Sequence, residues 1–507
     1  MLDDYVHLVG ENNLMSVSAW SLFSDGFNGF YRPLAFLFLR TVLFLFGPNP
    51  LVYHAYNFLL FYAISLMFYY MVRFLSKNEE LALLTACLYA VHPIHQMLIN
   101  YKTAGNNSIT ILCMQLSTWS FLKYFEAQKK YFYIFSILGY FLSLLAHEMS
   151  FMLPVYLFLI MYFLKDVPLR KNFTLCLPYL IAFVIYLFLR WSVNGPSGIE
   201  NIFSLRISFF PYLATLTKLL GWYLSKLLLP VNILFIWDER ISSHFSWHNG
   251  VLPGILGLTF LWALVKGKKD FKSFAYCFFI AGLTPSLLAS FVYTSRMQTA
   301  IIEPHWFEYS SIGFFVLAAL FFLSLRKFLN PQVWLTIIAF AIGLLSFLTY
   351  QSNFVWKDEK TYCLHWLKLN SLNGSAWHGL ANAYLREKDQ GLDKTKYPDC
   401  RVPSFLAGAY HVKGNVQTAL QYYDLALKMN PSCAFVFYGW GVLLSDTGDQ
   451  KQAHLFFDKA KDLNPDLYPI YQLLGDVFEN QHEQNTAMKI KYFIDRINPQ
   501  HSTWLEN

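Results

Sequence analysis

Ten stretches of at least 16 residues without a charged side chain recur between positions 41 and 356. A helix needs about 20 mostly apolar residues to cross a bilayer, so runs of this length predict membrane-spanning helices. Charged residues make up 14% of the chain, against about a quarter in soluble domains, which excludes a wholly soluble protein. We therefore expect an all-α, polytopic membrane helix bundle, with helices near 54–75, 81–98, 107–125, 131–147, 149–164, 173–192, 250–266, 273–293, 309–325 and 333–350. The amphipathic stretch 205–236 fits either a re-entrant hairpin or an interfacial helix pair.

Charge divides the chain into two parts. Residues 351–507 contain 16 basic and 17 acidic side chains, whereas residues 1–350 contain 23 basic and 15 acidic ones. A basic, apolar part followed by a near-neutral, polar part predicts a membrane domain joined to a soluble domain. The basic residues do not form one cluster, which argues against nucleic acid as a partner. We expect an outer-face loop with an acidic motif at 1–53, a membrane domain at 54–350, a degenerate helical repeat and linker at 351–402, and three helical repeats at 403–507.

Basic residues gather in alternate loops of the predicted membrane domain. The positive-inside rule places that end of the bundle in the cytoplasm. The opposite end collects 10 of the 15 acidic residues, including Glu148 between two apolar runs. The polar segment after Met1 would then lie outside, so we expect a further helix upstream of it. The basic loop residues are Arg73, Lys77, Lys123, Lys129, Lys130, Lys165, Arg170, Lys171, Lys266, Lys268, Lys269, Lys272, Arg326 and Lys327.

Three prolines in the C-terminal part, Pro431, Pro465 and Pro499, are each 34 residues apart. Small and aromatic residues recur with the same period. A period of 34 is that of the tetratricopeptide (TPR) repeat, in which pairs of helices stack into an α-solenoid. Such arrays present a concave surface that binds protein segments. A helical array without a particular ligand is the alternative.

Ionisable residues at the edges of the apolar runs are the candidates for chemistry, because such groups are costly at membrane depth and are often functional. Arg190 would suit a phosphate, since a guanidinium pairs with phosphate oxygens two at a time; an interfacial anchor is its alternative role. The histidines on either side of Pro93 favour helix capping or packing over a metal site. The full set of candidates is Asp3, Asp4, Arg32, His92, His95, His147, Glu148, Arg190, Asp238, Glu239 and His305.

The motifs of soluble enzymes are missing from the sequence. It contains no phosphate-cradling glycine loop, no Gly-x-Ser-x-Gly and no His-Glu-x-x-His. Its seven cysteines include no Cys-x-x-Cys pair, which excludes a disulfide scaffold or a zinc ribbon. An enzyme on the outer face would therefore need an activated donor that the membrane itself presents.

A series of short motifs resembles a known family. Asp3-Asp4 comes first, and then Tyr31-Arg32-Pro33-Leu34, Ala146-His147-Glu148 and Ser311-Ile312-Gly313-Phe314 precede the 34-residue repeats. This order and spacing resemble the transmembrane and TPR-containing O-mannosyltransferases and their bacterial relatives. The resemblance implies a membrane bundle of the C-type glycosyltransferase kind, followed by a TPR solenoid.

The resemblance also implies an activity. A sugar would move from a polyprenyl-phosphate carrier to a Ser or Thr hydroxyl of a translocated protein, with inversion at the anomeric carbon. Asp3, Asp4 and Glu148 would be catalytic, and Arg190 would bind the donor phosphate. His305 stands where family members carry an arginine and would act as a second phosphate ligand. A carboxylate can take the hydroxyl proton, and a fixed cation can stabilise the leaving phosphate.

The implied location is the bacterial inner membrane or the endoplasmic reticulum membrane, with the TPR repeats on the non-cytoplasmic side, where they would hold the acceptor. No metal ligands are predicted, although a divalent metal is left open. Two other functions stay open: a non-catalytic TPR scaffold for an envelope or secretion complex, and an O-oligosaccharide ligase. A transporter is less expected, because no charge falls in the middle of a predicted helix.

Overall fold

The computed structural model divides into two compact units. The first consists of Met1–Arg296 and Ala300–Phe354, here called the membrane unit, and the second of Met297–Thr299 and Val355–Asn507, here called the C-terminal unit. Within them the structure describes residues 14–27, 30–194, 209–234, 237–240, 251–286, 299–370, 374–386, 397–412, 414–446 and 449–464.

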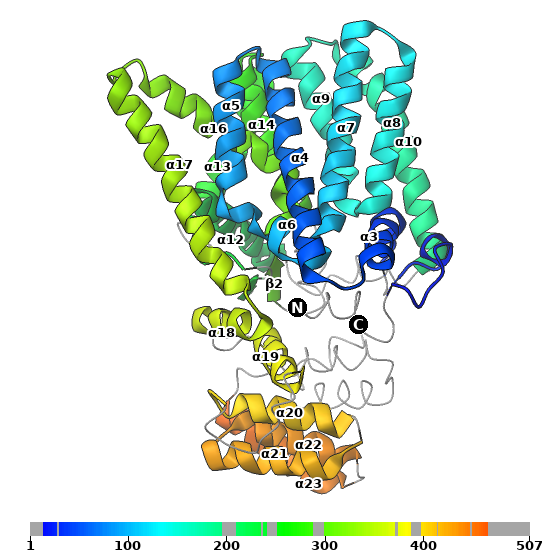
Figure 1. The fold of residues 1–507 in the computed structure, drawn as a ribbon, viewed down its shortest axis with the longest axis vertical. Helices are drawn as coiled ribbons and strands as arrows, with labels where there is room; N and C mark the ends of the chain where they lie inside the picture. The colour runs from blue at the N-terminus through cyan, green and yellow to red at the C-terminus, as the bar shows by residue number, and fades with distance from the viewer. Residues whose placement is uncertain are drawn as a thin grey trace. The chain divides into compact units, whose positions relative to one another are not determined.

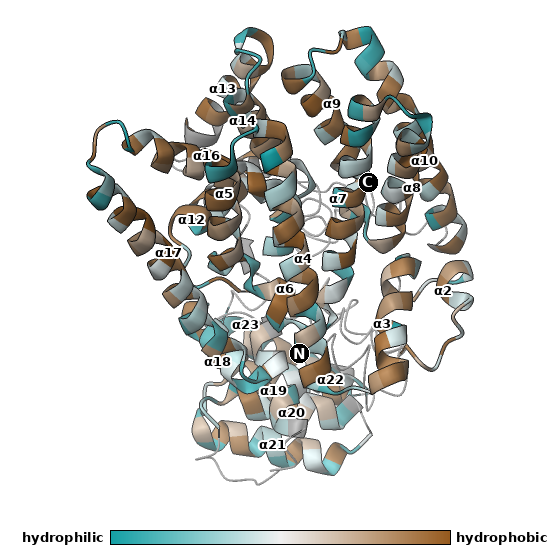
Figure 2. Ribbon diagram, turned by 45° about the horizontal axis from the view of Figure 1, so that its top comes forward, coloured by the Kyte–Doolittle hydropathy of each residue, from teal (hydrophilic) through white to brown (hydrophobic). Residues whose placement is uncertain are grey.

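The membrane unit is a bundle in which α4, α5, α7, α8 and α9 run side by side (Figure 1). Figure 2 shows apolar residues along these helices and polar residues in the loops that join them. Among its described residues, two four-residue strands form a small sheet. The elements are α2(Ser21–Ser24), α3(Pro33–Phe46), α4(Pro50–Ser76), α5(Glu79–Val91), η1(Pro93–His95), α6(Gln96–Asn100), η2(Lys102–Ala104), α7(Gly105–Ala127), α8(Lys130–Ala146), η3(Glu148–Met152), α9(Leu153–Leu164), α10(Leu169–Asn194), α12(Phe209–Leu228), β1(Trp237–Arg240), α13(Leu252–Lys266), α14(Phe271–Ala281), β2(Thr299–Ile302), η5(Pro304–Phe307), α16(Glu308–Leu325) and α17(Pro331–Asn353), with η6(Phe354–Trp356) at the division between the units.

Among the described residues, four stretches of helix are long and apolar enough to cross a membrane: Pro50–Ser76, Leu169–Val193, Pro304–Leu325 and Pro331–Trp356. A fifth candidate is the pair α5 and η1–α6, which is bent by 56°. Helices also occupy the other predicted segments, but several are short: α8 has 17 residues, α9 has 12 and α14 has 11. The described part of 205–236 holds one 20-residue helix, α12. Sequence hydropathy thus located the helices, and among the described residues four, or five with the bent pair, are long and apolar enough to span.

Local capping fixes where several of the helices begin. Asn49, Asn78 and Asn330 precede α4, α5 and α17, and each side chain accepts a hydrogen bond from a backbone N–H of the first turn. These bonds satisfy donors that have no partner inside the helix. Proline at the first helical position of α4 and α17 adds a backbone angle already suited to a helix.

Small residues allow close contact between helices of the bundle. Ser117 on α7 and Ser136 on α8 each donate to the other's backbone carbonyl, at 2.6 and 2.7 Å. A Cβ atom at Gly313 of α16 would lie 2.7 Å from the carbonyl oxygen of Ala275 on α14. Only glycine permits that approach, which gives the Ser-Ile-Gly-Phe motif a packing role.

The basic loops lie together at one end of the membrane unit, the upper end in Figure 1. Arg326, after α16, lies 3.2 Å from Glu80 at the start of α5. Lys269, between α13 and α14, pairs with Asp166, between α9 and α10. Lys123 of α7 lies over the Phe74 ring of α4. These contacts lie at the end that the positive-inside rule assigns to the cytoplasm.

The C-terminal unit consists of helices that pair in sequence order. Its helices are α18(Glu359–Leu369), α19(Gly374–Arg386), α20(Arg401–Val412), α21(Val416–Met429), α22(Ala434–Asp446) and α23(Gln450–Leu463). Helices α21 and α23 begin and end 34 residues apart, and their caps repeat too: Asn415 accepts from the Thr418 N–H, as Asp449 accepts from the Gln452 N–H. The period seen in the sequence therefore corresponds to a structural repeat over two helix pairs.

The small and aromatic residues of the 34-residue pattern pack inside these pairs. Ala419, Tyr423 and Ala426 are buried, and so are their counterparts Ala453, Phe457 and Ala460. A disulfide joins Cys400 to Cys433, which directly precede α20 and α22. The third expected repeat falls largely beyond residue 464, outside the described residues.

Candidate functional site

Arg32 and Glu148 form a two-pronged ion pair at the end of the bundle opposite the basic loops. Nε and Nη2 of Arg32 donate to the two carboxylate oxygens of Glu148, each at 2.9 Å. Arg32 caps α3 at its N-terminus, where Pro33 starts the helix, and Glu148 begins η3, directly after α8. The pair therefore connects segments 116 residues apart in sequence. Both side chains are partly buried, with 18% and 32% exposed.

Arg190 brings a second guanidinium to the same carboxylate. It lies in the last turns of α10, and its Nη1 is 3.8 Å from a Glu148 oxygen. With two arginines around one glutamate, the cluster carries an excess of one positive charge. Arg190 is 37% exposed, more than Arg32. The cluster therefore offers a partly open cation to an anionic ligand, a suitable arrangement for phosphate.

The arginines determine the ionisation of Glu148. Burial alone would raise the pKa of this carboxyl, but the charges of Arg32 and Arg190, with Arg32 the larger, outweigh that effect and hold the pKa well below its usual range. Glu148 is therefore a carboxylate at any physiological pH. A carboxylate so strongly stabilised is a weak proton acceptor.

Two buried histidines lie next to the cluster. Nδ1 of His147 accepts a hydrogen bond from the Met149 N–H at 3.2 Å and so caps η3. The same Nδ1 lies 3.7 Å from Glu148. His305, in η5, lies with its ring centroid 5.8 Å from that of His147 and with Nδ1 3.1 Å from Glu303. The structure thus brings together four of the predicted residues (Arg32, His147, Glu148 and Arg190) with His305 beside them.

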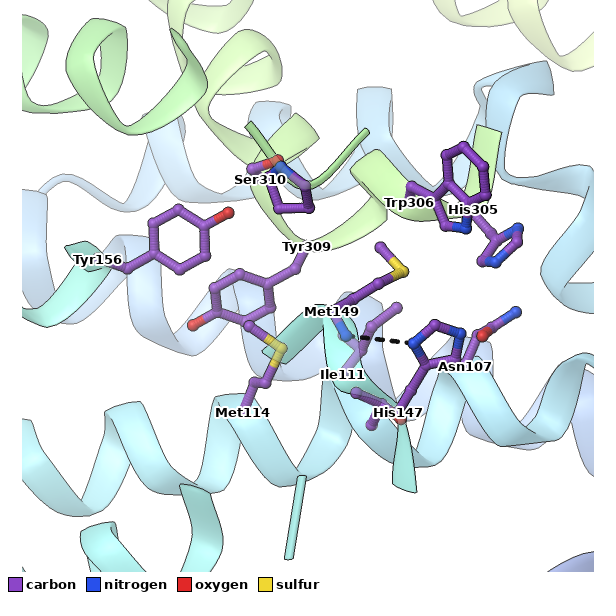
Figure 3. Close-up of a pocket in the computed structure, with 12 residues that line it drawn as sticks. Asn107, Ile111, Met114, His147, Met149, Tyr156, His305, Trp306, Tyr309 and Ser310 are labelled. Carbon is purple, nitrogen blue, oxygen red and sulfur yellow. Dashed lines mark hydrogen bonds between the residues drawn. The ribbon is translucent and has the colours of Figure 1, made fainter. Parts of the chain in front are cut away.

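A pocket opens between the two histidines and the bundle core (Figure 3). Its volume is about 20 Å³, which is room for one water-sized group. One wall is a single face of α7, where residues spaced three and four apart point the same way. The lining residues are Asn107, Thr110, Ile111, Met114, His147, Met149, Tyr156, Pro285, His305, Trp306, Tyr309 and Ser310.

The other two histidines of the predicted set have packing partners elsewhere. Nδ1 of His92 accepts from the Ile94 N–H at 3.2 Å and caps η1, while its Nε2 lies 3.2 Å from the Leu227 carbonyl. His95 pairs with Glu308, and both side chains are buried. These contacts join η1 to α12 and α16. None of the contacts described for either histidine reaches Glu148.

For the other four predicted residues, Asp3, Asp4, Asp238 and Glu239, no side-chain contacts are described. Asp3 and Asp4 lie outside the described residues. Asp238 and Glu239 belong to β1, which pairs with β2. Among the residues that the structure describes, no three His, Cys, Asp or Glu side chains gather as metal ligands.

Sequence reasoning did not find the partner of His95. Glu308 stood at the edge of an apolar run, but nothing in the sequence connected it to a residue 213 positions earlier. Asn57, in α4, was not among the candidates either. Its amide donates to the Tyr101 carbonyl at 2.7 Å and so anchors the turn between α6 and α7. A buried asparagine in an otherwise apolar helix was the available signal.

Comparison with known proteins relates part of the chain to a family. Residues 32–193, about a third of the chain, match the family model described as dolichyl-phosphate-mannose-protein mannosyltransferase. No curated protein and no solved structure matches the chain significantly. The matched segment begins at Arg32 and contains Glu148 and Arg190, so the whole charged cluster lies within it. That segment is thus similar to a family of membrane mannosyltransferases.

Proposed function

We propose that the protein is a membrane glycosyltransferase that moves a sugar from a polyprenyl-phosphate carrier to a hydroxyl group of a protein. Mannose is the first sugar to test, because the matched family model describes mannosyl transfer from dolichyl phosphate. The observation that carries the proposal is the Arg32–Glu148–Arg190 cluster inside the matched segment. Its net positive charge suits the phosphate of a lipid-linked donor.

The chemistry assigns one role to each group. The acceptor oxygen attacks the anomeric carbon as the bond from that carbon to the carrier phosphate breaks, and the phosphate leaves with the bonding electrons. A carboxylate takes the acceptor's proton, a role that fits Asp3 or Asp4. Arg190, with His305 nearby, stabilises the charge that grows on the leaving phosphate. Direct attack of this kind inverts the anomeric centre.

Glu148 contributes by orientation in this proposal. Because its pKa is held well below the usual range, it is a weaker base than an exposed aspartate. Its two oxygens instead fix the guanidinium of Arg32 and keep Arg190 close by. Without that carboxylate, two arginines at this separation would repel each other, so the phosphate site would lose its geometry.

The C-terminal unit would hold the acceptor on the non-cytoplasmic side. Its helix pairs with a 34-residue offset resemble TPR repeats, which bind extended protein segments. The Cys400–Cys433 disulfide supports that side, since disulfides persist in oxidising compartments and are rare in the cytoplasm. The site end of the membrane unit lies opposite the basic loops, which is consistent with the same side.

Transfer of labelled sugar from a panel of polyprenyl-phosphate sugars to protein, in membranes that contain the full chain, tests the proposal. We expect transfer by the wild type from one donor and its loss in the double variant Asp3→Asn/Asp4→Asn. Arg190→Ala should reduce transfer at least tenfold. Arg326→Ala, which removes an exposed arginine at the opposite end, is the matched control and should retain activity.

The negative outcome points to a specific alternative. If a folded wild-type protein transfers sugar from none of these donors, the glycosyltransferase proposal fails. The helix pairs of the C-terminal unit would then favour a membrane scaffold that assembles other proteins. Retained turnover in the double Asn variant would remove Asp3 and Asp4 from the mechanism but leave the transferase in place.

A further inference from the structure

The pocket beside the charged cluster contains a buried N–H donor. No described protein atom accepts a hydrogen bond from it. Nδ1 of His147 accepts a hydrogen bond from the Met149 backbone, so the proton of the neutral ring lies on Nε2. That nitrogen is buried and has no hydrogen-bond partner among the described residues. Only 2% of His147 is exposed, and its side chain lines the pocket. Leaving a buried donor without an acceptor costs free energy, so we expect an acceptor oxygen opposite this nitrogen.

Three other polar side chains of the pocket, Thr110, Tyr309 and Ser310, bond within the protein. Thr110 donates to the Asn106 carbonyl at 2.9 Å, and Ser310 bonds the Gly282 carbonyl at 3.1 Å. The hydroxyls of Tyr309 and Thr118 are 2.8 Å apart. These groups stabilise the pocket wall, whereas Nε2 of His147 is a buried donor that lines the same pocket. Figure 3 shows the bond from Met149 to His147 as a dashed line, with Asn107 and His305 at the same end of the pocket.

We propose that this pocket is a subsite for a single hydroxyl group of the transferred sugar, held by the Nε2–H of His147. The inference rests on the proposed function and adds a residue that recognises the donor. Position supports it, because Nδ1 of His147 lies 3.7 Å from Glu148, which also faces both arginines. A phosphate at the arginines would therefore bring the sugar next to the histidine. Size supports it as well, because about 20 Å³ accepts one hydroxyl and excludes a sugar ring.

Two substitutions of His147 test the roles of its two ring nitrogens separately. Asparagine places its side-chain oxygen near the position of Nδ1 and is a favoured cap, so His147→Asn keeps the cap of η3 and removes the inner donor. Glutamine reaches further and carries an N–H near the position of Nε2, so His147→Gln keeps the donor. Thermal unfolding in detergent shows whether each variant is folded.

The experiment compares transfer from the parent polyprenyl-phosphate sugar with transfer from its monodeoxy analogues, each lacking one hydroxyl. In the wild type, one analogue should react about tenfold to a hundredfold less efficiently, because it leaves His147 without an acceptor. In His147→Asn that discrimination should fall to within about threefold, because the donor is already gone. His147→Gln should retain most of it.

Three results would overturn the subsite. One is a wild type that transfers every monodeoxy sugar equally well, which needs no variant at all. Another is an unchanged discrimination in a folded His147→Asn protein. The third is complete absence of transfer by the wild type from every parent donor, which also overturns the proposed function. In the first two cases the glycosyltransferase stands and only the subsite fails.

Discussion

Glu148 faces Arg32 at 2.9 Å and Arg190 at 3.8 Å, and these two contacts differ in kind. The first is a planar fork with two hydrogen bonds, which fixes the orientation of the guanidinium. The second, at 3.8 Å, is longer than a hydrogen bond, so Glu148 does not fix the orientation of Arg190 in the same way. A single carboxylate can therefore hold one arginine in place and keep the other available to a ligand.

Replacing Glu148 by glutamine should destabilise the membrane unit. Glu148→Gln removes the charge that both arginines face, and we expect the free energy of unfolding to fall by about 1–3 kcal/mol, because a partly buried arginine loses its charged partner. Sugar transfer should fall with it. Thermal unfolding in detergent measures the first effect. Glu80→Gln breaks the exposed pair with Arg326 and should change stability by less than about 1 kcal/mol.

The pH dependence of the stability difference between wild type and Glu148→Gln tests whether the difference arises from the charge of Glu148. The folded-state pKa of Glu148 is depressed, so its contribution to stability is present above the unfolded pKa and is lost as the pH falls through the folded pKa. The gap between wild type and Glu148→Gln should therefore be constant from pH 7 to about pH 5 and should shrink below about pH 4.5. A gap that narrows between pH 7 and pH 6 would contradict an ionised Glu148.

At the scale of helices and strands, the sequence predicted the repeat of the C-terminal unit but not the lengths of the helices in the bundle. These two results have different causes. The repeat period predicted the 34-residue offset of α21 and α23, because capping and small-residue packing recur with the sequence itself. Helix length in the bundle could not be predicted in the same way. At the break after α5, Pro93 is visible in the sequence, but the contact of His92 with the Leu227 carbonyl, 135 positions away, is not.

Two glycines, each in the first helix of a helix pair, should respond oppositely to the same change. A Cβ atom at Gly441 of α22 would lie 2.6 Å from the Phe457 ring, whereas a Cβ at Gly408 of α20 meets nothing within 4 Å. Gly441→Ala should therefore destabilise the C-terminal unit by about 1–3 kcal/mol. Gly408→Ala should stabilise it by up to about 1 kcal/mol, since alanine favours helix.

Urea-dependent protease sensitivity of the C-terminal unit in the full-length protein measures both effects. Each substitution adds one methyl group to the first helix of a pair, so composition and helix propensity are matched. Equal effects of the two substitutions would mean that the contact between Gly441 and Phe457 does not hold α22 against α23.

For the whole molecule, the charged cluster shows what a sequence can and cannot specify. The motifs around Arg32 and Glu148 identified both residues, but only the fold showed that they bind each other across 116 positions. The cysteines are a similar case. Cys400 and Cys433 share no local motif and become neighbours only because successive helix pairs stack, so that equivalent positions before α20 and α22 meet.

The disulfide provides a test of the side on which the C-terminal unit lies. If the unit is made in an oxidising compartment, a maleimide that shifts gel mobility should modify five of the seven cysteines in denatured, unreduced membranes, and all seven after reduction. Cys400→Ser frees its partner, so six should react in both conditions. Cys363→Ser, a matched change at a free buried cysteine, should give four before reduction and six after.

The Cys400–Cys433 disulfide should also stabilise the C-terminal unit against unfolding. Closing a loop of about 33 residues restricts the unfolded chain, so reduction or Cys400→Ser should lower the stability of the C-terminal unit by about 3–4 kcal/mol. In Cys363→Ser, reduction should still lower the stability of the C-terminal unit as it does in wild type. Seven reactive cysteines in wild-type membranes before any reductant is added would instead place the unit in a reducing compartment, and acceptor binding on the outer side would then have to be abandoned.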